Sequence, residues 1–204
     1  MKVLMINGSP NQHGSTYTAL CEVQKILAEN GLDTEIFWIG REAINGCYGC
    51  SGCTKTNRCV TKDVVNEALD KADGADAIIL GSPVHYAGIA GNFKSFLDRF
   101  FWAGNFALKP GAAVVVARRG GASATLDGLN KYFTIAQMPV VSSQYWNMIH
   151  GLEKEDLAQD LEGMQILRTL GRNMAWLLKS IEAGRAAGVA LPKKERRAVT
   201  NFIH

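Results

Sequence analysis

The chain of 204 residues is 47% hydrophobic and 20% charged, which is the composition of an ordinary globular protein. Its net charge of +3 is mildly basic and lacks the concentrated cationic surface of a nucleic-acid-binding protein. No apolar run approaches the ~18 residues needed to cross a bilayer, so we expect neither nucleic acid nor membrane as a partner. The amino-terminal run VLMI is too short for a secretory signal, and we expect a cytoplasmic protein.

Short apolar runs alternate along the chain with longer stretches that have helical spacing. Strands are predicted at residues 2–6, 33–39, 76–83, 111–117 and 138–143. Helices are predicted at residues 17–31, 63–75, 91–103, 125–137 and 154–188, the last with room for an interruption. This alternation indicates an α/β fold in which a doubly wound parallel sheet has helices on both faces. We expect one domain over residues 1–188 and a basic tail over residues 189–204.

Polar loops rich in glycine and serine follow the first, third and fourth predicted strands. In an open parallel sheet, ligands bind outside the carboxyl ends of the strands, so these loops face one crevice. The first loop, NGSPNQHGST at 7–16, offers hydroxyls and glycines just before a helix N-terminus, as phosphate sites do. It has neither the lysine of a P-loop nor a G-x-G-x-x-G motif. The phosphate monoester of FMN fits such a loop, although a simply capped helix uses the same residue types.

The other two loops have the composition expected around a flat ring such as flavin. The segment GSPVHYAGIAG at 81–91 offers an apolar wall with backbone polar groups, formed by Pro83, Val84, His85, Tyr86 and Gly88. In the segment ARRGGAS at 117–123, Gly120 and Gly121 allow close backbone approach, and Arg118 brings charge toward a flavin edge or a phosphate. The alternatives are that Tyr86 is a core aromatic and Arg118 a solvated surface charge.

Taken together, GSPNQHGST, SPVHYAG, FKSFLDR and RRGG resemble the flavodoxin-like NAD(P)H-dependent FMN reductase superfamily, and SSQYWN at 142–147 is similar as well. The resemblance implies a five-stranded parallel sheet in the order 2-1-3-4-5 that binds FMN at the carboxyl ends of its strands. It implies a homodimer or homotetramer that completes the flavin pocket, with NAD(P)H as a co-substrate. The phosphate ligands that it implies are Ser9, Asn11, Gly14, Ser15 and Thr16. The flavin ring would lie between residues 83–88 and 118–121.

Four of the five cysteines fall in the loop at residues 46–60, with the spacing C-x2-C-x2-C-x5-C. In a reducing compartment, clustered cysteines more often bind metal or do redox chemistry than form disulfides. Zinc sites of four cysteines more often use two knuckles separated by about 15–20 residues, whereas this compact run suits a cubane cluster. Zinc, free thiols and redox disulfides remain open as alternatives. The fifth cysteine, Cys21, is predicted to be a small buried hydrophobe in the first helix.

The cysteine loop makes the chain most similar to the iron–sulfur flavoprotein branch of that superfamily. The resemblance implies a [4Fe–4S] cluster on Cys47, Cys50, Cys53 and Cys59. We therefore expect an FMN-dependent oxidoreductase that passes electrons between cluster and FMN, with ferredoxin or another small electron carrier as partner. No acid–base or nucleophilic catalytic residue is predicted. The alternatives are an NAD(P)H-dependent FMN or quinone reductase without a cluster, and a non-enzymatic flavodoxin-like or zinc-stabilised binding protein.

Overall fold

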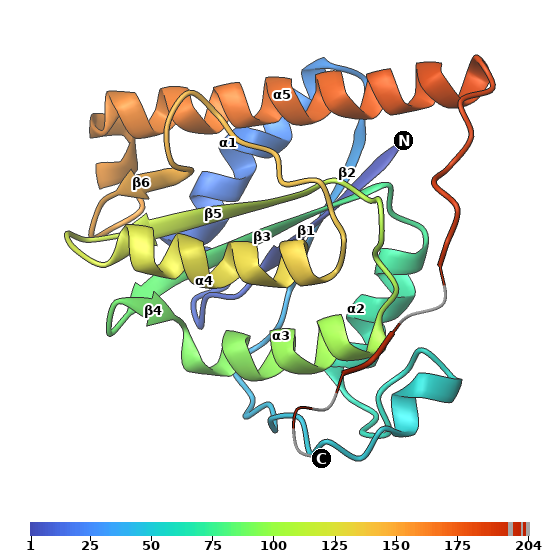
Figure 1. The fold of residues 1–204 in the computed structure, drawn as a ribbon. Helices are drawn as coiled ribbons and strands as arrows, with labels where there is room; N and C mark the ends of the chain where they lie inside the picture. The colour runs from blue at the N-terminus through green and yellow to red at the C-terminus, as the bar shows by residue number, and fades with distance from the viewer. Residues whose placement is uncertain (196–197, 201, 203–204) are drawn as a thin grey trace.

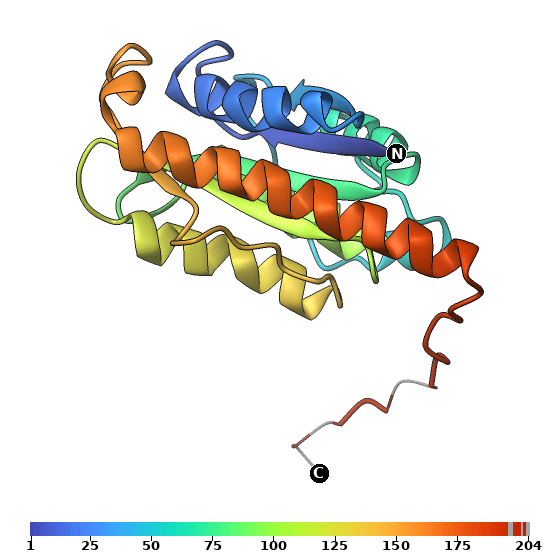
Figure 2. The same ribbon diagram turned by 90° about the horizontal axis from the view of Figure 1, so that it is seen from above.

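The computed structural model describes residues 1–195, 198–200 and 202, so residues 196–197, 201 and 203–204 of the predicted basic tail lie outside the described residues. A central sheet is covered by α1 and α5 on one face and by α2, α3 and α4 on the other (Figures 1 and 2). The strands are β1 (Lys2–Asn7), β2 (Asp33–Trp38), β3 (Ala77–His85), β4 (Gly88–Ile89), β5 (Gly111–Ala117) and β6 (Met148–His150). The α-helices are α1 (Ser15–Glu29), α2 (Val64–Asp73), α3 (Gly91–Ala103), α4 (Ala122–Ile135) and α5 (Leu161–Ala186).

The sheet runs in the order β2-β1-β3-β5-β6, and its pairs along this path are parallel. A sixth strand, β4, pairs antiparallel with the end of β3. The predicted five-stranded sheet in the order 2-1-3-4-5 is therefore wrong as stated. It missed β4 because Tyr86 and Ala87, at φ 50° and 55°, form a tight turn between His85 and Gly88 without the glycines that usually mark it.

The strand predicted at 138–143 is also wrong. This segment makes a single parallel bridge, between Val140 and Gly111, because Pro139 has no N–H to donate to a ladder. The edge strand is instead β6, whose three residues pair with Val115–Ala117. The helix predicted at 154–188 is interrupted: a short 3₁₀ turn, η2 (Asp156–Gln159), precedes α5. Asp160 separates them and caps α5, since its Oδ1 accepts a hydrogen bond of 2.8 Å from the Gly163 N–H.

Alternate residues of the central strands fill two apolar layers. In β1, Leu4 and Ile6 pack toward α2 and α3, whereas Val3 and Met5 pack toward α1 and α5. All four side chains are fully buried, and burial of each contributes roughly 1.5–3 kcal/mol. The strands are thus held rigidly from both sides, and their carboxyl ends form a fixed platform for the loops.

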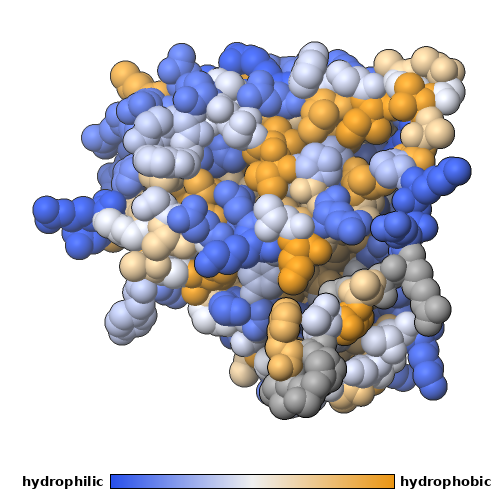
Figure 3. All heavy atoms as spheres, in the orientation of Figure 1, coloured by the Kyte–Doolittle hydropathy of each residue, from blue (hydrophilic) through white to orange (hydrophobic). Residues whose placement is uncertain are grey.

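Surface exposure separates two aromatic residues near the end of α3. Phe106 is a core residue, whereas Trp102 is 63% exposed at the end of α3. The face seen in Figure 3 carries hydrophobic residues interspersed with hydrophilic ones. Although α5 is 26 residues long, no helix within the described residues is apolar enough to cross a membrane.

Candidate functional site

The loop after β1 is shaped by a buried asparagine. Asn7 is fully buried; its Oδ1 accepts from the Ser9 N–H at 3.0 Å, and its Nδ2 donates to the Gln12 carbonyl at 3.0 Å. The Ser9 Oγ in turn accepts from the Asn11 N–H at 3.1 Å. These bonds curl the predicted phosphate loop back on itself, so its backbone is fixed before any ligand arrives.

Two side chains from the end of β2 support this loop from outside. The indole of Trp38 donates to the Ser9 carbonyl at 2.8 Å. Arg41 donates through Nε to the Pro10 carbonyl at 2.8 Å and through Nη2 to Asn11 Oδ1 at 3.3 Å. Arg41 therefore adds a positive charge beside the loop, which favours a bound anion.

The loop leads into an uncapped helix N-terminus. Gly14 is the N-cap residue of α1, no side chain caps the helix, and its first turn has no acidic residue. The first N–H groups of α1 and the helix dipole thus favour an anion at this end. Ser15 lies at the first turn with its Oγ 3.4 Å from the Leu152 carbonyl. Thr16 is buried instead, with its methyl packed against Gly81 of β3.

A cleft of about 910 Å³ opens over this helix end, between the phosphate loop and the segment that follows β6. The walls are formed by the phosphate loop, by Trp38 and Arg41, and by residues 152–155. The phosphate-loop residues that line it are Asn11, Gln12, His13, Gly14 and Ser15. Hydroxyl, amide and uncapped N–H donors around one open cleft fit a phosphate group.

The two loops predicted to frame a ring pack against each other. Gly121 has φ 89°, and a Cβ there would lie 2.7 Å from the Ala87 Cα and 3.0 Å from the Val84 Cγ1. Only glycine permits both this conformation and this approach. The contact joins the β3–β4 turn to the start of α4. Pro83, Val84 and Gly88 are partly buried along it, while the side chains exposed around it are His85, Tyr86 and Arg118, with Gly120 open to solvent.

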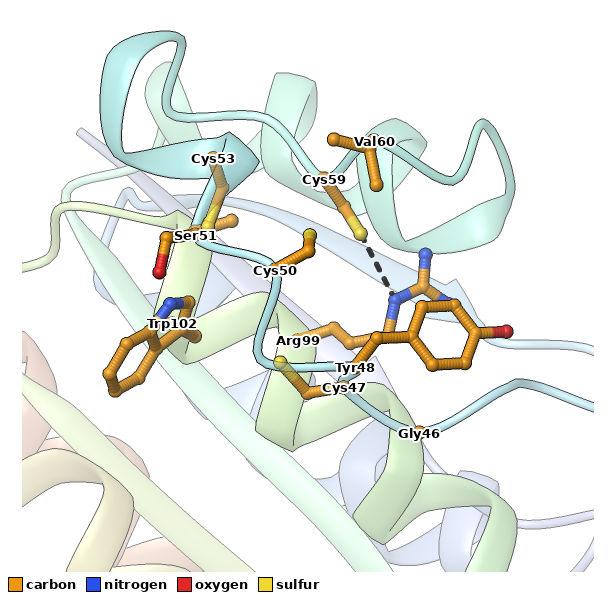
Figure 4. Close-up of a pocket in the computed structure, with 11 residues that line it drawn as sticks. Gly46, Cys47, Tyr48, Cys50, Ser51, Cys53, Cys59, Val60, Arg99 and Trp102 are labelled. Atoms are coloured by element: carbon orange, nitrogen blue, oxygen red, sulfur yellow. Dashed lines mark hydrogen bonds between the residues drawn. The ribbon is translucent and has the colours of Figure 1, made fainter.

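The four loop cysteines line one pocket beside α3 (Figure 4). Cys47 and Cys50 are exposed, Cys59 is partly buried, and Cys53 is 8% exposed. Burial raises the pKa of the Cys53 thiol. Trp102 and Arg99 of α3 complete the wall. The loop thus brings four thiols from a 13-residue stretch, residues 47–59, around one space.

Arg99 joins the cysteine loop to α3. Its Nε donates to the Cys59 Sγ at 3.2 Å, drawn as the dashed line in Figure 4. Burial acts to raise the pKa of the Cys59 thiol, but hydrogen bonds and charge from Arg99, with bonds from Thr61, outweigh it and lower the pKa below its ordinary value. Cys59 is therefore held as a thiolate more readily than an ordinary cysteine, and the thiolate is the form that ligates metals.

The four thiols are the right kind of ligands for a cluster, but they lie too far apart to hold one as they stand. Four thiols around one pocket match the ligands of a [4Fe–4S] cluster or of zinc. Within the described residues, however, no three His, Cys, Asp or Glu side chains lie close enough together to hold a metal ion. Metal binding to such a loop would draw the thiols together, since a site of this kind orders when it is loaded.

The two candidate sites lie at opposite ends of α3. The phosphate loop packs on its first turn, because a Cβ on Gly8 would lie 2.1 Å from the ring of Phe93. The cysteine pocket contacts Arg99 and Trp102 in its last turns. At about 1.5 Å per residue, residues 93 and 102 are ~14 Å apart along the helix axis. Within one chain, therefore, the cysteines do not lie directly beside the flavin loops.

Local sequence patterns predicted the ligand-binding loops but not the side chains from elsewhere in the chain that support them. The buried Asn7, Trp38 at the end of β2 and Arg41 after it belong to no motif of their own. Only the position of Arg99 is informative in the sequence, because it lies one turn after Phe96 at the border of the apolar stripe of α3. A charged residue at that border suggests a buried ion pair, but nothing in the local pattern identifies its partner.

Comparison with known proteins agrees with this architecture. Two solved structures share the fold. RosB with bound 8-demethyl-8-formylriboflavin-5′-phosphate superposes with a TM-score of 0.70 and is 13% identical, over 100% of this chain and 93% of RosB. An archaeal flavodoxin superposes with a TM-score of 0.61 and is 18% identical, over 88% of this chain and 99% of the flavodoxin. At such identities the likeness shows the fold alone, which is flavodoxin-like.

Sequence relatives define the family more narrowly. Residues 1–153 match the NADPH-dependent FMN reductase family. An iron–sulfur flavoprotein of Methanocaldococcus jannaschii is 34% identical over 89% of this chain and 100% of its own length. One of Methanosarcina thermophila is 28% identical over 91% and 99%. The chain therefore belongs to the iron–sulfur flavoprotein branch of the NADPH-dependent FMN reductase family, as its motifs predicted.

Proposed function

We propose that this chain is an FMN-dependent oxidoreductase that passes electrons between FMN and a [4Fe–4S] cluster held by Cys47, Cys50, Cys53 and Cys59. The observation that carries the proposal is the arrangement of all four cysteines around one pocket against α3. The family and the names of the relatives support both cofactors. When bound, the cluster supplies one-electron and the flavin one- or two-electron chemistry.

The protein's own residues bind and orient the flavin. Ser9, Asn11, Gly14, Ser15 and Thr16 surround the phosphate, with Ser15 and the N–H groups of α1 as the direct donors. Thr16 would bind the phosphate through its backbone N–H, because its side chain is buried with the methyl packed against Gly81. Arg41 balances the phosphate charge from the side of β2.

The ring would lie against the joined β3–β4 and β5–α4 loops. We assign this role to the residues predicted for it, Pro83, Val84, His85, Tyr86, Gly88, Arg118, Gly120 and Gly121. The close contact of Gly121 with Ala87 keeps the wall rigid. Arg118 is exposed there and places positive charge where a reduced, anionic flavin would gain from it.

The separation of the two sites within one chain favours a homo-oligomer. Electron transfer slows steeply with distance, and the cysteine pocket lies about 14 Å along α3 from the phosphate loop. We propose a homodimer or homotetramer in which the cysteine loop of one chain lies near the flavin loops of another. A ferredoxin-like carrier in the cytoplasm is the proposed one-electron partner.

Cofactor content tests this function directly. Anaerobically purified protein is expected to contain FMN, together with about four irons and four acid-labile sulfides per chain. Cys53→Ser should lose the iron and sulfide and keep the FMN, whereas Cys21→Ser, in α1 and outside the pocket, should keep all three. A wild-type sample with FMN but no iron or sulfide would contradict the cluster; zinc in its place would favour a structural loop.

The spacing of the cysteines also supports a second candidate function, that of an NADPH-dependent FMN reductase without a cluster. Since no group of donors within the described residues is spaced to hold a metal ion, the loop is also compatible with a reductase that has no cluster. In that case NADPH, named in the description of the family, would reduce FMN by hydride transfer. Rapid bleaching of the flavin by NADPH in iron-free protein would support this second function.

A further inference from the structure

Arg99 is a charged residue buried almost completely in the apolar face of α3. It is 3% exposed, and a buried guanidinium is costly unless its charge and its donors are satisfied. Its Nη1 and Nη2 form a bidentate pair with the Asp63 carboxylate, at 2.7 and 2.9 Å. The remaining Nη donors reach the Asn45 carbonyl at 3.3 Å and the Thr61 carbonyl at 3.2 Å. All five N–H groups are engaged once Cys59 is included.

These five bonds join the two ends of the cysteine loop. Asn45 precedes Cys47, whereas Thr61 and Asp63 follow Cys59. The ion pair with Asp63 and the two carbonyl bonds would be enough to fasten the loop to α3. The fifth bond goes instead to a sulfur that belongs to the candidate ligand set. A charged N–H donor to a sulfur does more than hold a loop, because it stabilises negative charge on that atom.

The charges around the pocket make this effect local. Arg58, the neighbour of Cys59, is directed away and pairs with Asp70 and Asp73 at 2.8 and 2.5 Å. Asp63 is the carboxylate that faces Arg99, and it also caps α2 by accepting from the Val65 N–H at 3.1 Å. The sulfur side of the pocket therefore receives a positive charge from Arg99 that Asp63 partly offsets.

We propose that Arg99 is the positioning and tuning residue of the four-cysteine site: it fixes Cys59 as a ligand and raises the reduction potential of the cluster. This inference rests on the proposed function, since it requires the cluster. Reduction adds an electron to an already anionic centre, and a nearby positive charge with an N–H···S bond favours the reduced form. Asp63 opposes this effect, so the two partners of one ion pair should shift the potential in opposite directions.

The test is an anaerobic redox titration of the holoprotein, with the reduced cluster followed by electron paramagnetic resonance and iron and sulfide measured on each sample. Arg99→Gln should shift the midpoint potential to more negative values. Arg99→Lys should shift it less, because an ammonium keeps the charge but not the five-donor fork. Asp63→Asn should shift it to more positive values, and it keeps a side-chain oxygen to cap α2. Arg58→Gln is the matched control and should leave the potential unchanged.

Opposite shifts in the variants of residues 99 and 63 would not arise from a purely structural role. If Arg99→Gln fails to fold, Arg99→Lys and Asp63→Asn still give the two signs. Unchanged potentials in the cluster-loaded variants of both residues would overturn this inference and leave the proposed function intact. A wild-type protein without iron and sulfide would contradict the proposed function, and this inference with it.

Discussion

The candidate flavin site depends on the absence of a side chain at Gly8. Gly8 follows β1 directly, and its N–H donates to the Gly81 carbonyl at 2.9 Å. A Cβ at this position would lie 2.1 Å from both the Cγ and the Cδ1 of Phe93. Because the Phe93 ring is fully buried and stacks on the Phe96 ring, it has little room to move away. The phosphate loop can therefore lie against α3 only while residue 8 has no side chain.

Gly8→Ala is accordingly expected to destabilise the protein by roughly 1–3 kcal/mol, the usual cost of overpacking a core. The same change should weaken FMN binding, because the loop must shift away from Phe93. Urea denaturation and a flavin-binding titration measure the two effects. Gly91→Ala is the matched control, since a Cβ there meets no atom within 4 Å. Equal stability and affinity in the two variants would show that the loop does not depend on this contact.

At the scale of residues, the sequence predicts the loops better than the side chains that support them. Ser9, Ser15 and Gly121 belong to short patterns with a local physical meaning: hydroxyls before a helix, or glycine at a positive φ. Trp38 and Arg99 act on atoms 29 and 40 residues away, the Ser9 carbonyl and the Cys59 sulfur. Such pairs depend on strand order and helix packing, which a local pattern does not contain.

The helices α3 and α4 are linked on the solvent side of their shared core by a polar group of three residues. Lys94 pairs with Asp98 at 2.9 Å and lies 3.0 Å from the Tyr132 hydroxyl, which donates to Asp98. Burial, and then the bond to Asp98, raise the pKa of Tyr132 to about 12. The contact matters for the site because α3 supports the cysteine pocket and α4 begins at the flavin loop.

Tyr132→Phe should lose roughly 0.5–1.5 kcal/mol of stability at neutral pH through the missing hydrogen bond. Since the folded pKa of about 12 exceeds the ordinary 10.0, the protonated phenol stabilises the fold. This contribution is complete below pH 10 and is lost as the pH rises toward 12. Wild-type stability should therefore fall more steeply than that of the variant over this range in thermal unfolding. Parallel curves would contradict the link, and Tyr145→Phe, at an exposed loop position, serves as control.

At the scale of elements, the prediction of helices and strands succeeds where apolar residues recur at a regular spacing over a long segment. The helix predicted at 91–103 has the observed bounds of α3, because four aromatic and leucine side chains define its stripe. It fails at the sheet edge, where β6 has three residues and the more apolar segment at 138–143 contains Pro139. Short edge strands are selected by pairing with a neighbour, and only the folded sheet supplies that neighbour.

In the whole molecule, the cysteine loop and the flavin loops lie on different sides of one chain (Figure 1). Exposed aromatic side chains lie beside each: Trp102, 63% exposed, borders the pocket, and Tyr86, fully exposed, is at the turn after β3. Large aromatic residues that a folded chain leaves in solvent are enriched at protein interfaces. The arrangement thus agrees with the oligomer proposed above.

Light scattering after size exclusion should accordingly give two or four times the chain mass of 22.2 kDa. Trp102→Ser is expected to shift the protein toward the single-chain mass, because it removes an aromatic anchor beside the cysteine pocket. Trp176→Ser, on α5 at the other face of the sheet, should keep the wild-type mass. A wild-type mass of one chain would contradict the oligomer and require electrons to cross the length of α3.

The most direct test of the central claim is anaerobic stopped-flow reduction of the flavin by a reduced ferredoxin, compared between wild type and Cys53→Ser. We expect rapid bleaching of the flavin in the wild type and strongly slowed bleaching in the variant, with FMN still bound in both. Equal rates in the two proteins would contradict it, because electrons would then reach FMN without passing through the four-cysteine pocket.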